Sequence, residues 1–166
     1  VMSIYEDQAG VMWFGTFGGG VNKFDPNQQK FALYRDVPSG ENGLQGMGIW
    51  AFLEDSEGIL WVGTYDAGLN RYDHASGEWR NYTADSSDPS ALPSESIVSL
   101  YEDSSGTIWL GTTDAGIAKY DREEDSFTQY EAPPWVLDIY EDSRGQIWIG
   151  GFGGLGKLDR ETGDIQ

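Results

Sequence analysis

The chain has 166 residues, 39% of them hydrophobic, so it is long enough and apolar enough to bury a core. Its 28 acidic and 10 basic side chains give a formal net charge of −18, which would repel the phosphate backbone of a nucleic acid. The sequence has no cysteine, no long apolar run and no signal-peptide pattern in residues 1–10, so we expect no disulfide, no thiolate metal site and no membrane segment.

Four copies of one unit follow each other along the chain. A Glu-Asp dipeptide recurs at intervals of 48, 48 and 39 residues: Glu6-Asp7, Glu54-Asp55, Glu102-Asp103 and Glu141-Asp142. Tryptophans recur at the same intervals: Trp13, Trp61, Trp109 and Trp148. A fixed period of this size is typical of repeat architectures.

Each copy predicts four short strands separated by turns rich in Asp, Ser and Gly. The strands are apolar on both faces, as expected where each small sheet is packed between two others. We therefore predict an all-β fold, a β-propeller of four four-stranded antiparallel blades at residues 1–34, 49–82, 97–130 and 136–166. Two arrangements are open: a four-bladed ring, or part of a larger propeller of, for example, seven blades.

The repeated residues have structural explanations. A large ring between adjacent blades suits propeller packing, so we interpret the four tryptophans as core. The Glu-Asp pairs occur in every blade, which favours turn stabilisation over a unique active site. Residues 151–156 match the nucleotide-binding pattern G-x-G-x-x-G, but no helix follows. His74 is the only histidine, so we expect no catalytic triad, no metal and no cofactor.

Positions that differ between the copies are the better candidates for a ligand site. In a propeller, the connection between the second and third strands and the connection to the next blade open on the same side. These connections and the adjoining strand starts supply Phe17, Trp50, Tyr65, Asp66, Asp114, Trp135 and Phe152. Aromatic rings beside carboxylates suit sugars. Alternatively, Trp50 and Trp135 plug the central channel. Asp138 replaces a small residue on an inner strand and is a further candidate, unless it only faces a water-filled channel.

The unit L-Y-E-D-S-S-G-T-I-W-L-G-T-T-D-A-G-I-A-K-Y-D, from Leu100 to Asp121, resembles the two-component regulator propeller repeat, and all four copies fit. In that family such repeats build seven-bladed propellers in the periplasmic sensor part of hybrid histidine kinases, where they help to detect oligosaccharides. The resemblance implies a periplasmic or extracellular sensor domain whose parent protein carries a kinase.

Three functions are compatible with these observations. The first is a non-enzymatic sensor module that recognises a carbohydrate. The second is a glycan-active hydrolase or lyase that uses Asp66, Asp114 or Asp138. The third is a structural or protein-binding propeller. Because an open set of blades leaves apolar faces uncovered, we also expect self-association through these faces.

Overall fold

The computed structural model describes residues 1–26, 30–38, 40–160 and 162–166, and fifteen strands form four antiparallel sheets. The first sheet contains β1 (Ser3–Glu6), β2 (Met12–Thr16), β3 (Gly20–Asp25) and β4 (Lys30–Tyr34). The second contains β5 (Ile49–Glu54), β6 (Ile59–Thr64), β7 (Leu69–Asp73) and β8 (Glu78–Tyr82). The third contains β9 (Ile97–Glu102), β10 (Ile108–Thr112), β11 (Ile117–Asp121) and β12 (Ser126–Tyr130). The fourth contains β13 (Val136–Glu141), β14 (Ile147–Gly151) and β15 (Gly154–Leu158).

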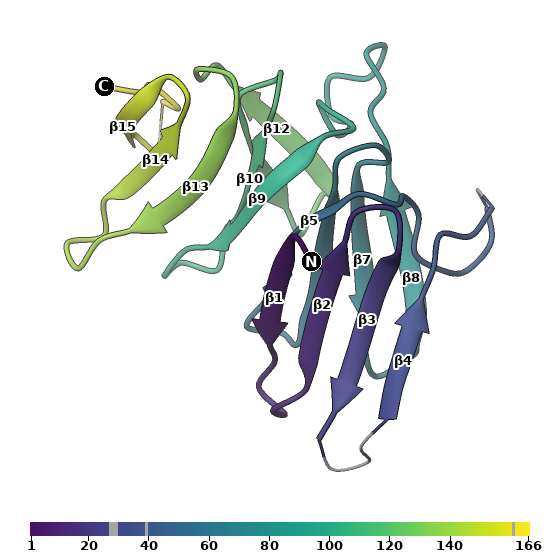
Figure 1. Ribbon diagram of the computed structural model, residues 1–166. Coiled ribbons are helices and arrows are strands. Elements are labelled where there is room, and N and C mark those ends of the chain that lie inside the picture. Colours follow the sequence, from purple (N-terminus) through teal and green to yellow (C-terminus); the bar gives the residue numbers. More distant parts are fainter. Residues whose placement is uncertain (27–29, 39, 161) are drawn as a thin grey trace.

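The sheets follow one another as propeller blades, with the inner strands β1, β5, β9 and β13 side by side in chain order. Figure 1 shows an open arc with the first and last sheets at its two ends. The outward faces of these end sheets are uncovered, because Ile4 on β1 is 61% exposed and Tyr140 on β13 is 59% exposed. The propeller prediction is confirmed, and the arc favours part of a larger propeller over a closed four-bladed ring.

The fourth sheet differs from the prediction of four strands per blade. It has three named strands, and an isolated bridge between Leu158 and Ile165 stands where the fourth strand of the other sheets pairs with the third. Backbone hydrogen bonds between Lys157 and Gln166, in both directions, extend this pairing.

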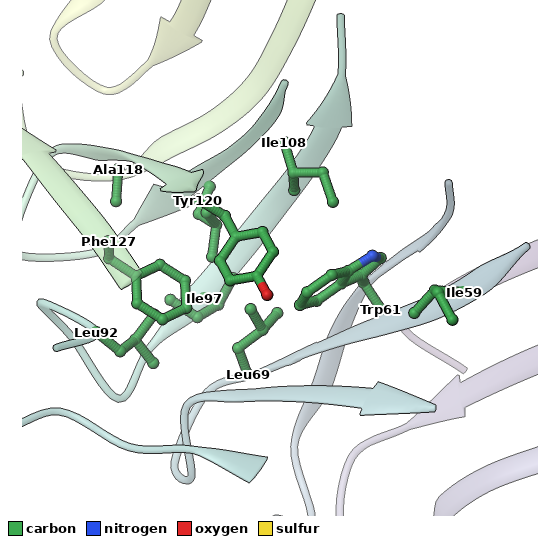
Figure 2. Packing of buried hydrophobic residues seen from close by; sticks show 10 residues of the cluster. Ile59, Trp61, Leu69, Leu92, Ile97, Ile108, Ala118, Tyr120 and Phe127 are labelled. Atoms are coloured by element: carbon green, nitrogen blue, oxygen red, sulfur yellow. The ribbon is translucent and has the colours of Figure 1, made fainter. Parts of the chain in front are cut away.

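The core lies between successive sheets. Trp13, Trp61 and Trp109 are at most 1% exposed, and each packs with apolar residues of the following sheet. Figure 2 shows Trp61 of the second sheet and Tyr120 of the third pointing toward one another, with their ring centroids 4.9 Å apart. The interpretation as core is confirmed for these three tryptophans, whereas Trp148 is partly exposed on the uncovered face of the fourth sheet, because no further sheet packs against it in this chain.

A hydrogen bond from the indole to the repeated aspartate fixes each tryptophan. In the second sheet, Trp61 Nε1 donates to Asp55 Oδ2 over 2.8 Å, and the amide of Ile59 donates to Asp55 Oδ1 over 2.9 Å. The other three sheets have the equivalent indole bond, at 2.8 to 3.0 Å. The aspartate thus closes its own turn and satisfies an indole donor, which confirms turn stabilisation for the aspartate of each Glu-Asp pair.

The glutamates of the last three pairs, Glu54, Glu102 and Glu141, have a different role, which we did not predict: each connects its sheet to the preceding one. Glu102 accepts hydrogen bonds from the amide and the hydroxyl of Ser56 in the preceding sheet, both at 2.7 Å. Arg122 strengthens the same junction, because it lies 3.0 Å from both Asp55 and Glu102. Ser56 belongs to the turn of the preceding sheet, so the sequence of a single repeat does not reveal that it is the partner of Glu102.

The next junction repeats this arrangement. Arg160 forms ion pairs with Asp103 of the preceding sheet, at 3.3 Å, and with Glu141. Burial has the largest influence on the pKa of Asp103 and raises it, but hydrogen bonds from Ser105, Trp109 and Thr107 together hold the pKa below its ordinary value of 3.8. The carboxylate is therefore stabilised in its charged form at the sheet junction.

Candidate functional site

The connections that carry the candidate residues meet at one end of the arc. The amide of Tyr65, after β6, donates to the carbonyl of Gly48, before β5, over 2.8 Å. The amide of Trp135, before β13, donates to the carbonyl of Thr113, after β10, over 3.1 Å. Connections within sheets and connections between sheets therefore lie together.

Aromatic side chains from this end are here called the aromatic belt: Phe17, Trp50, Tyr65, Trp135 and Phe152. All of them except Phe17 form a continuous chain of ring contacts. The rings of Trp50 and Tyr65 stack with centroids 5.6 Å apart, and those of Trp135 and Phe152 stack at 5.4 Å. Trp135 also lies 6.4 Å from Trp50 and 6.3 Å from Tyr65, which joins the second sheet to the fourth. These centroid distances are typical of direct ring contact.

The outer members of the aromatic belt are open to solvent. Phe17 and Phe152 are 73% and 75% exposed, and Tyr65 is 39% exposed. Phe17 forms a bridge with Gly48, the residue whose carbonyl binds Tyr65, so it extends the belt toward the first sheet. Contiguous exposed apolar side chains often mark interaction surfaces in soluble proteins.

Trp50 is placed in the aromatic belt by an irregularity of the inner strand. The pairing of β5 with β6 shifts register between Ile49 and Ala51, so Trp50 is the extra residue of a β-bulge. Bulges redirect side chains and are common beside functional sites. The indole Nε1 of Trp50 is buried and has no hydrogen-bond partner in the part of the chain that the structure describes.

Trp135 has an unusual backbone conformation. Its φ is +60°, in the left-handed region that bulky side chains rarely adopt. The carbonyl of Trp135 is also so close to Gly151 that a Cβ at Gly151 would collide with it. Such strain is retained where the surrounding structure enforces it, and it is concentrated at functional sites.

The candidate carboxylates are hydrogen-bonded within the protein. Asp66 is exposed, and its Oδ1 accepts from the amides of Met47 and Gly48 over 3.3 and 3.4 Å. Asp114 is also exposed and accepts from the Ser94 hydroxyl over 2.6 Å. Asp66 joins the connection that carries Tyr65 to the connection before Trp50, whereas Asp114 joins the connection after β10 to the connection before β9. The remaining acceptor sites of both carboxylates are free to meet solvent.

Asp138 is not brought to the aromatic belt. It lies on the uncovered face of the fourth sheet, in a shallow hollow also lined by Tyr140, Trp148 and Leu155. Its counterpart in the third sheet, Ser99, donates a hydrogen bond to the carbonyl of Val136 in the fourth. The position of Asp138 therefore corresponds to a sheet-to-sheet contact.

A cavity of about 210 Å³ opens beside Trp135, and sequence reasoning missed it. Pro133, Trp135, Ile149, Gly151 and Ile165 are among the residues that line it. In the second sheet, Asn70 occupies the position equivalent to Gly156 and binds the backbone of Gln45 through its amide and its carbonyl. At Gly156 the space of a side chain is taken by Ile165, whose Cγ2 would lie 2.5 Å from a Cβ there. The glycines that resembled a nucleotide motif therefore line an apolar cavity instead.

In the part of the chain that the structure describes, no group of three or more His, Asp or Glu side chains is arranged to hold a metal ion. None of the described residues belongs to a helix that could cross a membrane.

An open arc of packed four-stranded blades with an aromatic surface at one end defines the class of protein as a β-propeller module. The family model described as "Two component regulator propeller" matches residues 1–18, 43–66, 91–114 and 131–153, more than half of the chain. The chain belongs to the two-component regulator propeller family.

Solved structures agree with this assignment. The extracellular domain assigned to the hybrid two-component system BT3049 of B. thetaiotaomicron is 27% identical, with a TM-score of 0.85 over 98% of this chain. The extracellular domain assigned to the one-component system BT4673 of the same organism is 22% identical, with a TM-score of 0.76 over 99% of the chain. The chain spans 22% and 24% of the lengths of these structures.

A more distant similarity concerns the fold alone. Virginiamycin B lyase of Staphylococcus aureus is 17% identical, with a TM-score of 0.72 over 98% of this chain and 53% of its own length. No curated protein sequence matches the chain. The family match and the BT3049 similarity therefore identify a sensor propeller module.

Proposed function

We propose that this propeller is the ligand-recognition part of an extracytoplasmic sensor and that its ligand is a carbohydrate. The observation that carries the proposal is the aromatic belt, in which rings from the second and fourth sheets form one partly exposed surface and Phe17 of the first sheet lies beside Gly48. The location is supported by the extracellular domains of similar structure.

The chemistry of the aromatic belt suits a sugar. The faces of the exposed rings offer flat apolar area, on which the C–H face of a pyranose packs. Carboxylates beside the rings, such as Asp66, accept hydrogen bonds from hydroxyl groups. The cavity beside Trp135 lies next to the belt and is smaller than the roughly 300 Å³ of a typical small-molecule site, so it would take one sugar unit or a substituent.

The roles of the acidic groups favour binding of a glycan without its hydrolysis. Asp66 and Asp114 are engaged in holding connections, and Asp138 lies on a separate face. A glycosidase requires two carboxyl groups flanking one bond. The arrangement therefore supports binding more than hydrolysis.

Binding to a panel of neutral and acidic oligosaccharides, measured by isothermal titration calorimetry with the whole chain, tests this proposal. We expect at least one oligosaccharide to bind and to change the tryptophan fluorescence, because two indoles lie in the aromatic belt. Indifference to the whole panel would contradict the proposal, and turnover of a bound glycan would favour the enzymatic alternative.

We further propose that the uncovered faces at the ends of the arc associate with a second copy of the chain. Leu155 is 73% exposed, whereas its counterparts Leu69 and Ile117 are fully buried against the following sheet. The opposite end of the arc presents Ile4, so one chain carries both halves of the packing that it makes internally. Light scattering is expected to show a mass that rises with concentration, and the variant Trp148→Arg is expected to reduce it. A monomer at every concentration would contradict this expectation.

A further inference from the structure

The charges around the aromatic belt are distributed very unevenly. The connections that start and finish at this end of the arc are residues 17–19, 35–48, 65–68, 83–96, 113–116, 131–135 and 152–153. One basic residue, Arg35, lies in them, with eight acidic residues: Asp36, Glu41, Asp66, Asp85, Asp88, Glu95, Asp114 and Glu131. The two long connections reach along the sheets to the opposite end, where Asn42 binds the amide of Trp79 and Ser90 binds the amide of Phe127, so Glu41 and Asp88 lie away from the aromatic belt.

Several of these acidic groups are held in place by backbone donors at this end. Asp36 accepts from the amide of Gly46 over 2.8 Å, and Glu95 accepts from the amide of Ala84 over 3.0 Å. Asp66 directly follows Tyr65 of the aromatic belt and accepts from the amides of the connection before β5. The negative groups are therefore part of the framework that positions the rings.

Five of the other basic side chains are bound away from the aromatic belt. Arg122 and Arg160 are bound in the sheet junctions at the opposite ends of the strands, and Arg80 pairs with Asp125 in the turn between β11 and β12. Lys23 and Arg71 lie over the rings of Trp13 and Trp61, within the sheets. These cations stabilise the blades and do not compensate the charge around the belt.

From this distribution we infer that the ligand is a glycan without acidic groups and that the propeller rejects uronate-containing and sulfated chains. The inference rests on the proposed function and adds the class of glycan. A carboxylate accepts hydrogen bonds but cannot donate them, so the acidic groups at this end are satisfied by hydroxyl or amino donors. A ligand carboxylate would meet groups of the same charge in an environment where repulsion is only partly screened.

The orphan donor in the aromatic belt is consistent with this inference. The Nε1 of Trp50 is the kind of group that binds a hydroxyl or ether oxygen when neighbouring rings move aside. A neutral sugar supplies both this acceptor and the donors for the carboxylates.

Matched pairs of oligosaccharides that differ only in oxidation at C6 test the inference. We would titrate the whole chain with hexamers of β-1,4-mannan, cellulose and galactan and with hexamers of the corresponding uronans. We expect a neutral hexamer to bind at least tenfold more tightly than its uronan. Raising the salt concentration is expected to narrow this difference by weakening the repulsion of the uronan.

Charge reversal provides the matched variants. Glu131→Lys lies in the connection beside Trp135, whereas Glu123→Lys lies in the turn between β11 and β12 at the other end of the strands. Both side chains are exposed, so we expect both variants to fold. The first is expected to improve uronan binding several-fold with little effect on the neutral hexamer, and the second is expected to change neither.

The outcomes separate the two proposals. Equal or tighter binding of a uronan by the unmodified chain would overturn the inference and leave the proposed carbohydrate recognition intact. Absence of binding by every hexamer, neutral and oxidised, would contradict both.

Discussion

Replacement of Asp55 by alanine is expected to destabilise the fold by about 3–5 kcal/mol, the cost of removing one partner of a buried ion pair. The Asp55 carboxylate is completely buried and binds Trp61 Nε1, the amide of Ile59 and Arg122. The substitution leaves an indole donor unsatisfied in the core and removes a counter-charge from a partly buried guanidinium. A loss of this size is a large part of the stability of an ordinary domain.

Chemical denaturation followed by tryptophan fluorescence measures this effect. Asp55→Asn should lose less, because the amide oxygen still accepts from Trp61 while the charge is removed. Asp142→Ala is the matched control, since Asp142 makes the same bond to Trp148 on the uncovered face of the fourth sheet. We expect a smaller loss there, and equal losses at both positions would show that the sheet junction adds nothing.

Replacement of Trp135 by alanine is expected to weaken glycan binding at least about 30-fold, because truncating an aromatic anchor costs about 2 kcal/mol or more. Trp135 is the ring that joins Trp50 and Tyr65 to Phe152. Its loss would divide the aromatic belt into two separate surfaces. Titration calorimetry with a binding oligosaccharide checks the prediction.

A second substitution at this position separates binding from folding. Because φ of residue 135 is +60°, glycine suits its backbone better than tryptophan does. Trp135→Gly is therefore expected to bind as poorly as the alanine variant and to unfold at a higher denaturant concentration than it. Trp148→Ala removes the same side chain from a surface outside the aromatic belt. Equal loss of binding in that control would contradict the role given to Trp135.

The repeated positions could be predicted because repetition reports local structure and packing together. Each copy has a tryptophan and an aspartate at the spacing of Trp61 and Asp55, so the same strand pair and the same turn form in all four sheets. The same contact with a following sheet forms in the first three. The resemblance of the repeat to a known family, which the comparisons confirmed, supplied the sensor class.

Non-repeated positions depended on the tertiary structure. Asp66 and Asp114 were expected beside a ligand, and the structure shows that both also hold connections. Asp138 was grouped with them because it is singular, but it lies on an end face of the arc. The sequence carries no signal for such differences, because they depend on which backbone amides a neighbouring sheet brings into reach.

The sequence alone therefore determined the blades, the core position of the first three repeated tryptophans, the acidic character and the end of the blades at which the candidate residues lie, because these follow from period, composition and strand direction. Only the tertiary structure decided that Trp50 is redirected by a bulge, that Trp135 adopts a positive φ, and that the two rings meet although a whole sheet separates them in the chain. Such contacts depend on the angle between sheets and on the path of one short connection. A local sequence pattern predicts neither of them.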